Sequence, residues 1–267
     1  MRTPVLSALL GLSLAACVGA VPGDPVGGGG DDGSNTGSNT GSNTGSNNPD
    51  PIPAVAISVD HTTLTSDLGV ENLITVTATG SMGFSGAVTL TASAVDATSG
   101  AVLADWNVKL DSATLTLDTD GTATAKVTVN LPGNAASLLG KIKISAASAA
   151  APVEADVALT ANPVLDVLIA DNGGNCAYPT LTPYNLKVGR SMKVINGSAT
   201  LGLTVHVGPQ VSAGFAHEGG VTAPGDAYKG QGPLTDVVNG IPFYCHNGNQ
   251  NTLNGLPNSS MTLNVVQ

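Results

Sequence analysis

The sequence predicts an all-β protein with two successive β-sandwich domains, and three observations support this fold class. Only 10% of the 267 residues are charged and 3% are aromatic, whereas roughly 25% of an average soluble domain is charged. Long stretches alternate between apolar residues and Thr or other polar residues, which is typical of half-buried strands. The length allows about two domains of roughly 100–150 residues each.

The charge balance excludes two classes of protein. The chain has 9 Lys and Arg against 19 Asp and Glu, a formal charge of −10. A nucleic-acid-binding protein needs clustered Lys and Arg to neutralise phosphates, so we expect no nucleic-acid partner. A helical bundle would carry more Glu, Lys and Arg on its surface. The composition instead indicates a protein that works outside the cytoplasm.

Residues 1–17 have the features of an export signal. Arg2 gives a positive start, and a short apolar core follows from Val5 to Leu14. That core is too short to cross a bilayer, which takes about 20 residues. The signal therefore predicts export, and the simplest form of it is an ordinary cleaved peptide followed by an incidental cysteine.

The end of this signal suggests a more specific fate. Leu14-Ala15-Ala16-Cys17 resembles the lipobox of bacterial lipoproteins. The resemblance implies that Cys17 is lipidated and becomes the mature N-terminus, so that the N-terminal lipid is the membrane attachment. Val18 follows instead of Asp, which by the same resemblance favours the outer membrane or cell surface.

Residues 18–53 have the composition of a disordered linker. They contain four consecutive glycines, the sequence Gly-Ser-Asn-Thr three times between residues 33 and 44, and prolines at 49, 51 and 53. Such a segment buries too little apolar surface to offset the cost of ordering the chain. As a flexible coil it would span roughly 30–35 Å on average. We expect it to act as a tether.

Residues 54–162 have the pattern of the first sandwich. Alternating segments at 73–79, 87–91 and 122–129 are separated by glycine- and proline-containing turns, a spacing that favours a sandwich of short strands. Gly83-Phe84-Ser85-Gly86-Ala87-Val88-Thr89-Leu90 resembles a recurring segment of bacterial Ig-like repeats, which implies an Ig-like domain. We expect Trp106, the single tryptophan, to be a packing residue of the core or its rim and not a platform for a ligand.

Residues 163–267 have the pattern of a second sandwich, with strands expected at 164–170, 191–196, 201–207 and 261–266. This half also holds three of the four histidines and two of the three cysteines. They are His206, His217, His246, Cys176 and Cys245. Their concentration makes this half the candidate functional region.

Four segments of this half resemble the plastocyanin-like cupredoxins. They are Thr180–Asn196, Thr204-Val205-His206, Ala223-Pro224-Gly225-Asp226-Ala227-Tyr228 and Phe243-Tyr244-Cys245-His246-Asn247. The resemblance implies a cupredoxin-like sandwich that holds copper at one end, with His206, Cys245 and a second histidine as ligands. It also implies single-electron transfer and a redox partner that the sequence does not identify.

The ligand pattern departs from that family. A blue-copper centre takes two imidazoles, one thiolate and a weak axial thioether. The family's second histidine follows the cysteine by three residues, where this chain has Gly248, and Met261 lies further from Cys245 than is usual. A non-standard copper set of His206, His217, Cys245 and His246 is the corresponding prediction.

The two cysteines support a competing interpretation. In an exported protein whose Cys17 is lipidated, Cys176 and Cys245 form an even pair, which is typical of a disulfide. That bond would remove the thiolate a blue-copper site requires. The residues leave three states open: a Cys176–Cys245 disulfide, a copper thiolate at Cys245, and neither.

The sequence lacks the patterns of common enzymes. His217-Glu218 is not followed by a second histidine at zinc-protease spacing, and there is no nucleophile elbow or phosphate-binding loop. We therefore expect no enzyme. The predicted function is a surface-anchored lipoprotein that binds copper or transfers single electrons. The alternative is a non-catalytic surface binding or structural lipoprotein with a metal-free, disulfide-locked scaffold, and a third interpretation is copper buffering without redox turnover.

Overall fold

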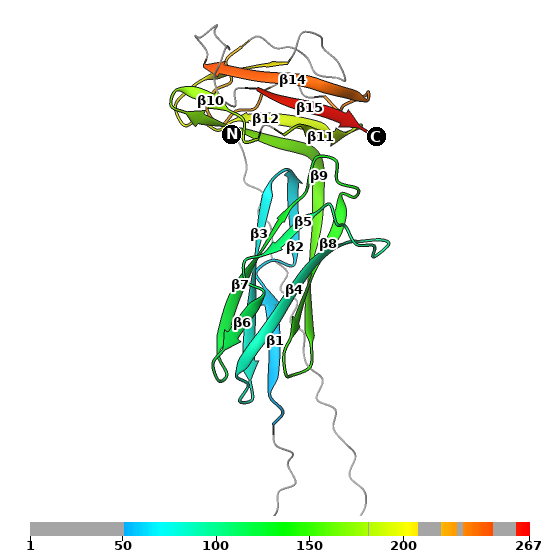
Figure 1. The fold of residues 1–267 in the computed structure, drawn as a ribbon, viewed down its shortest axis with the longest axis vertical. Coiled ribbons are helices and arrows are strands. Elements are labelled where there is room, and N and C mark those ends of the chain that lie inside the picture. The colour runs from blue at the N-terminus through cyan, green and yellow to red at the C-terminus, as the bar shows by residue number, and fades with distance from the viewer. Residues whose placement is uncertain (1–50, 181, 208–219, 229–231, 248–259) are drawn as a thin grey trace, which may run out of the picture. The chain divides into compact units, whose positions relative to one another are not determined.

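A computed structural model describes residues 51–180, 182–207, 220–228, 232–247 and 260–267 (Figure 1). Every regular element in these ranges is a β-strand, which confirms the predicted all-β class. None of the described residues forms a helix long and apolar enough to cross a membrane. The predicted signal with Cys17, nearly all of the linker, and His217 lie outside the described residues.

The described residues form fifteen strands. Their bounds are β1 Ala54–Val59, β2 Thr63–Leu68, β3 Glu71–Ser81, β4 Gly86–Asp96, β5 Asn107–Leu110, β6 Thr114–Leu117, β7 Thr122–Asn130, β8 Leu139–Ala147, β9 Val153–Asn172, β10 Asn175–Ala177, β11 Tyr184–Lys187, β12 Ser191–Asn196, β13 Leu203–Val207, β14 Val238–Asn247 and β15 Ser260–Val266.

The first sandwich consists of two sheets. One has four strands in the order β1-β3-β7-β5, all antiparallel. The other contains β6, β4, β8 and the first part of β9, with β2 added in parallel to β9. The alternation expected from the sequence decides which side chains face inward: Ile74, Val76 and Ala78 of β3 are fully buried, while the Thr residues between them are half-buried. This sandwich is Ig-like.

Trp106 is a packing residue, as predicted, and of the two positions expected for it, core or rim, it has the core, with 2% of its surface exposed. Its ring lies against Gly140 of β8, and a Cβ atom placed at Gly140 would come within 2.6 Å of the ring. The strand therefore uses glycine here because the indole occupies the space that any larger side chain would need.

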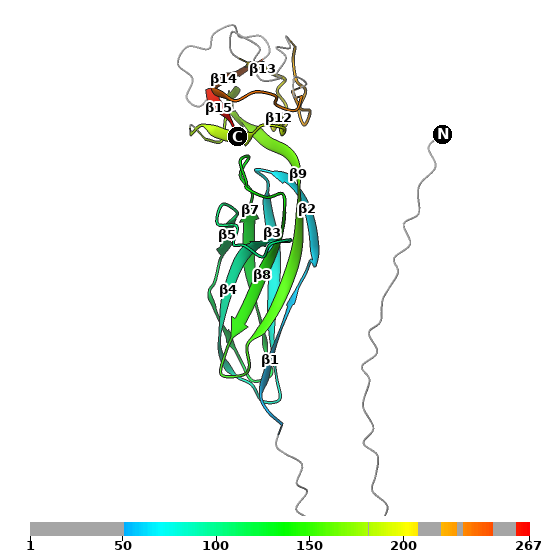
Figure 2. The ribbon, with the colours of Figure 1, turned by 90° about the vertical axis from the view of Figure 1, so that its right-hand side faces the viewer.

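Strand β9 belongs to both halves of the molecule. Its residues 153–160 pair with β8 and residues 158–165 with β2, whereas residues 164–169 pair in parallel with β12 (Figures 1 and 2). The boundary expected between residues 162 and 163 thus falls inside a continuous strand. Pro163 is tolerated there because the register with β2 shifts between Asp67 and Leu68, and prolines within sheets occur at such irregularities.

The second sandwich consists of a four-stranded sheet, in the order β11-β15-β14-β13, and of the second part of β9, with which β10 and β12 pair. Its core includes Phe243, Leu263 and Val194, all completely buried. Strand β12 has the predicted bounds. Strand β13 pairs antiparallel with β14, so that Thr204 lies opposite His246 and His206 opposite Tyr244. This pairing determines the candidate site.

Candidate functional site

A disulfide joins Cys176 of β10 to Cys245 of β14, with an S–S distance of 1.99 Å and a Cα–Cα distance of 6.1 Å. Both residues are buried, at 1% and 0% exposure. The bond spans 69 residues of sequence and fastens the short β10 to the four-stranded sheet. Of the three states that the sequence left open, the structure has the disulfide.

The disulfide bears on the predicted copper set at one residue, Cys245. A bonded Cys245 has no thiolate, which is the ligand that a blue-copper centre requires. Strand geometry adds a second obstacle, because successive side chains of a strand point to opposite faces. Cys245 points into the core, whereas His246 is half-buried on the other face of β14. Cys245 therefore does not fit as a copper ligand beside His246.

Met261 also faces the core. It lies opposite Phe243 in the pairing of β14 with β15 and is 3% exposed. Phe243 and Cys245 share the inward face of β14, so Met261 lies on the side away from His246. Its thioether does not provide an axial ligand on the histidine side, and its role is packing.

His206 and His246 do come together, on neighbouring strands of the four-stranded sheet. Their Nε2 atoms lie 2.9 Å apart, within hydrogen-bonding distance. The two rings are stacked with centroids 5.0 Å apart, and the ring of Tyr244 stacks on His206 at 4.9 Å. We call His206 and His246 the histidine pair. It lies on the outward face of β13 and β14, where its residues are half-buried.

The hydrogen bonds of His246 define its tautomer. Its Nδ1 lies 2.9 Å from the backbone oxygen of Asn247. A carbonyl oxygen only accepts, so Nδ1 carries the proton and donates. Nε2 of neutral His246 is then left with a lone pair, and it accepts a hydrogen bond from the Nε2–H of His206.

The other predicted or isolated metal-binding groups do not join this pair in the part of the chain that is described. His217 lies outside the described residues. His61 is on the first sandwich, half exposed, with its nearest carboxylate, that of Asp60, 3.9 Å away. Among the described residues, no three His, Cys, Asp or Glu side chains gather closely enough to hold a metal ion.

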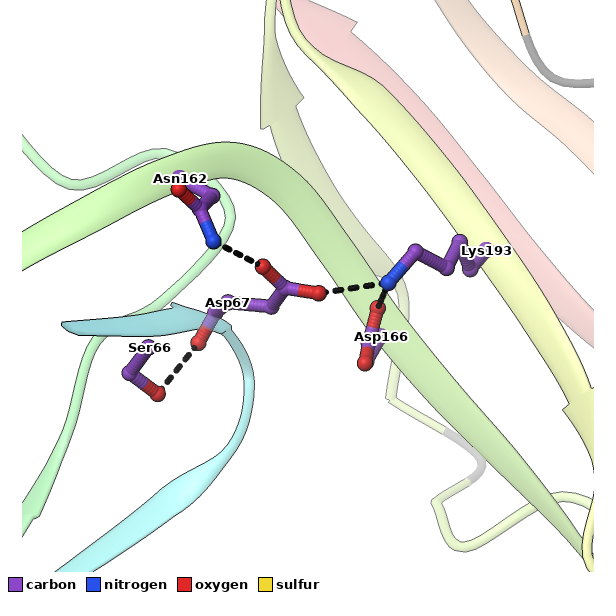
Figure 3. Close-up of polar contacts among 5 residues, drawn as sticks. All are labelled: Ser66, Asp67, Asn162, Asp166 and Lys193. Carbon is purple, nitrogen blue, oxygen red and sulfur yellow. Dashed lines mark hydrogen bonds and ion pairs between the residues drawn. The ribbon is translucent and has the colours of Figure 1, made fainter. Parts of the chain in front are cut away.

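A second polar site lies where β2, β9 and β12 meet (Figure 3). Lys193 of β12 places its Nζ 2.5 Å from Oδ2 of Asp67 and 3.3 Å from Oδ1 of Asp166. Asn162 donates from Nδ2 to Oδ1 of Asp67 at 2.7 Å. We call Asp67, Asn162, Asp166 and Lys193 the junction cluster. It links β2 of the first sandwich to β12 of the second.

The two carboxyl groups of this cluster differ in their electrostatics. Burial opposes the ionisation of Asp67, but hydrogen bonds from Lys193 and Asn162 outweigh it and lower the pKa of Asp67. For Asp166, burial is the larger effect and raises its pKa despite the nearby ammonium group. The hydrogen bond to Asp67 raises the pKa of Lys193, which keeps it charged. One lysine thus contacts two carboxyl groups, and its single charge can balance only one of them.

Arg190 makes a second contact between the halves, just before β12. Its side chain is buried, and it donates from Nη1 to the carbonyl of Gly133 and from Nη2 to that of Ala135, both at 2.6 Å. These carbonyls belong to the connection between β7 and β8 of the first sandwich. The planar guanidinium is suited to two such acceptors at once.

Sequence reasoning missed the junction cluster and Arg190. Asp67 and Lys193 are 126 residues apart, so no local spacing connects them. The available signal was a charged residue within each of two strand patterns, Asp166 in one and Lys193 in the other. A charge in a half-buried strand needs a partner of opposite sign, which is a reason to search for one.

No family model matches the chain, and no curated protein matches it. Solved structures with similar folds include a family 123 glycoside hydrolase from Clostridium perfringens, with TM-score 0.34 and 11% identity over 42% of this chain and 30% of that one. The BIgI domain of the beta protein from S. agalactiae has TM-score 0.26 and 18% identity, over 41% of this chain and 97% of that one. A tandem of titin Ig domains has TM-score 0.25 and 12% identity, over 81% of this chain and 99% of that one.

The chain spans less than a third of the length of that glycoside hydrolase. All three TM-scores are low, and neither activity nor ligand follows from them. The class of protein is set by the fold itself: an all-β protein with an Ig-like β-sandwich and a buried disulfide.

Proposed function

We propose that this chain is a non-catalytic surface lipoprotein that holds its C-terminal sandwich away from a membrane for binding or structural purposes. In this proposal the acyl chains on Cys17 are the anchor, residues 18–53 are the tether, and the Ig-like sandwich is a spacer. The observation that carries the proposal is the Cys176–Cys245 disulfide, which uses the only two cysteines left once Cys17 is lipidated. A buried disulfide suits an exported structural protein.

The contacts between the halves support a spacer role. Strand β9 runs through both sandwiches, and Arg190 and the junction cluster join them through side chains. A spacer transmits the position of its far end only if it bends little between its modules. A shared strand with charged contacts on it resists bending more than a flexible linker does.

Copper binding with single-electron transfer, the first function suggested by the sequence, is the competing proposal. In its blue-copper form it requires the disulfide to open and Cys245 to turn from the core toward a histidine. The same protein sample distinguishes the two proposals, because a copper thiolate gives an intense visible absorption band and a disulfide gives none.

The test uses the full chain expressed in a Gram-negative host that processes lipoproteins. We expect it in the membrane fraction, with Cys17→Ser moving it to the soluble fraction, because the lipid is the proposed attachment. We expect no reactive thiol in the unfolded, unreduced mature protein, two after reduction, and no intense thiolate band on adding Cu(II) to the oxidised protein. Two free thiols together with an intense band would overturn the proposal in favour of electron transfer, and an unchanged distribution of Cys17→Ser would remove the anchor.

A further inference from the structure

The structure brings two imidazole nitrogens together without involving Cys245. His206 and His246 are fixed on adjacent antiparallel strands, diagonally across the β13–β14 pairing. Their Nε2 atoms are 2.9 Å apart. Both are on the outward face of the sheet, whereas the disulfide lies on the inward face. A cation bound by the histidine pair therefore leaves the disulfide intact.

The distance between the two nitrogens favours one coordination geometry. Imidazole nitrogens bind first-row metals at about 2.0–2.1 Å, so nitrogens 2.9 Å apart would subtend about 90° at a shared metal. That angle suits neighbouring ligands of a square-planar or tetragonal ion, which is the preference of Cu(II) and Ni(II). The tetrahedral angle preferred by Zn(II) would require the nitrogens to separate by a few tenths of an ångström more.

The surroundings of the pair prepare it for a metal. The Nδ1–H of His246 donates to the carbonyl of Asn247, which orients the ring and leaves Nε2 with its lone pair. A backbone carbonyl in this position is the usual outer partner of a metal-bound histidine. The stacked ring of Tyr244 restricts His206 in the same way. Both ligands are thus oriented before any cation arrives, which reduces the entropy lost on binding.

We propose that the histidine pair is a Cu(II)-binding site of the tetragonal, thiolate-free kind, with His206 Nε2 and His246 Nε2 as neighbouring ligands and water completing the coordination. On binding, Cu(II) takes the place of the proton that lies between the two Nε2 atoms, this proton is released, and the redox state does not change. This goes beyond the proposed surface function, which needs no metal, and it differs from a blue-copper centre in lacking the cysteine.

The test is a titration of the oxidised full chain with Cu(II), followed by calorimetry and electron paramagnetic resonance. We expect one Cu(II) per chain, a tetragonal spectrum with nitrogen hyperfine structure, and no thiolate band. His206→Ala and His246→Ala should each weaken binding by about tenfold or more, because one of two protein ligands is lost. His206→Gln keeps a polar side chain on β13 and is expected to fold, so weaker binding by this variant reports the loss of the ligand and not unfolding.

His61→Ala is the matched control, since it removes an exposed histidine on the other sandwich. It should bind Cu(II) as the unmodified chain does. Equal affinity of the unmodified chain and the folded His206→Gln and His246→Ala variants would overturn the proposal. An intense visible band with loss of the disulfide would overturn it as well, by placing Cys245 in the site. Equal affinity of the variants would overturn this proposal alone and leave the proposed surface function untouched, whereas an intense band with loss of the disulfide would overturn both.

Discussion

At the scale of single residues, the informative feature is that two basic side chains, Lys193 and Arg190, each make two polar contacts at the junction of the two sandwiches. Lys193 is shared by two carboxyl groups, and Arg190 by two backbone carbonyls. In a chain with 9 Lys and Arg among 267 residues, two of them meet at one junction. Replacing Lys193 or Arg190 by an apolar residue leaves polar groups of the first sandwich without their partner. The resulting loss of stability exceeds that from losing a surface ion pair.

Lys193→Met should destabilise the protein by about 1–2 kcal/mol at neutral pH, between the values for exposed and buried pairs because Lys193 is 38% exposed. The pKa of Asp67 is lowered below its ordinary 3.8, so its ion pair stabilises the fold above that pH and is lost as the pH falls through the lowered pKa. Burial raises the pKa of Asp166, so Asp166 is protonated before Asp67 as the pH falls. In the variant, this protonation removes the repulsion between the two carboxylates. The cost should therefore be smaller at pH 4 than at pH 7.

Urea unfolding of the two proteins at both pH values measures this difference. Lys141→Met is the control, since Lys141 forms an exposed pair with Asp156 at 3.9 Å. It should change the free energy of unfolding by less than about 0.5 kcal/mol. A Lys193→Met cost no larger than that of the control, or one that grows on acidification, would contradict the role assigned to the junction cluster.

At the scale of elements, each segment in which the local pattern predicted alternation became a strand or part of one. The alternating segments at 73–79, 87–91 and 122–129 lie within β3, β4 and β7, and the segment 191–196 is β12. A period of two is local, so neighbouring residues suffice to reveal it. The boundary at 162/163 could not be found in this way, because a strand that passes from one sandwich to the next has the same alternation on both sides. Only its pairing partners change, and these are distant in sequence.

The β8–Trp106 contact gives a prediction at this scale. Gly140→Ala places a Cβ against the buried ring, and the surrounding strands leave little room for it to move, so we expect a loss of about 1–3 kcal/mol. Fluorescence reports the change directly, because Trp106 is the single tryptophan. Gly220→Ala is the control, since a Cβ at Gly220 would meet nothing within 4 Å. Equal stability of the two variants would show that the ring adjusts without cost.

At the scale of the whole molecule, the continuous β9 makes the two sandwiches energetically dependent on each other. Unfolding either half removes pairing partners from the same strand, and it also breaks the contacts of Arg190 and Lys193. Two modules joined only by a flexible linker would unfold independently. The shared strand favours a single cooperative transition instead.

We therefore expect the folded part of the chain to unfold in one step in guanidinium, with the disulfide kept intact. Trp106 fluorescence reports on the first sandwich, and near-ultraviolet circular dichroism of the tyrosines, which lie in the second, reports on the other. The two curves should have the same midpoint. Arg190→Lys, which cannot donate to both carbonyls in the same planar arrangement, should lower the shared midpoint and begin to separate the curves. Well-separated midpoints in the unmodified chain would show that β9 does not couple the sandwiches.

The sequence by itself determined the all-β class, several strands of both halves and the packing role of Trp106, because these depend on alternation and composition. It also reduced the state of Cys176 and Cys245 to three alternatives. The tertiary structure decided among these, separated Cys245 from His246 onto opposite faces of β14, and brought His206 to His246 and Lys193 to Asp67. The physical reason is that such contacts depend on strand register and on the order of the strands in the sheets. The two histidines are 40 residues apart, and Lys193 and Asp67 are 126 apart, so no local pattern in the sequence reveals either contact.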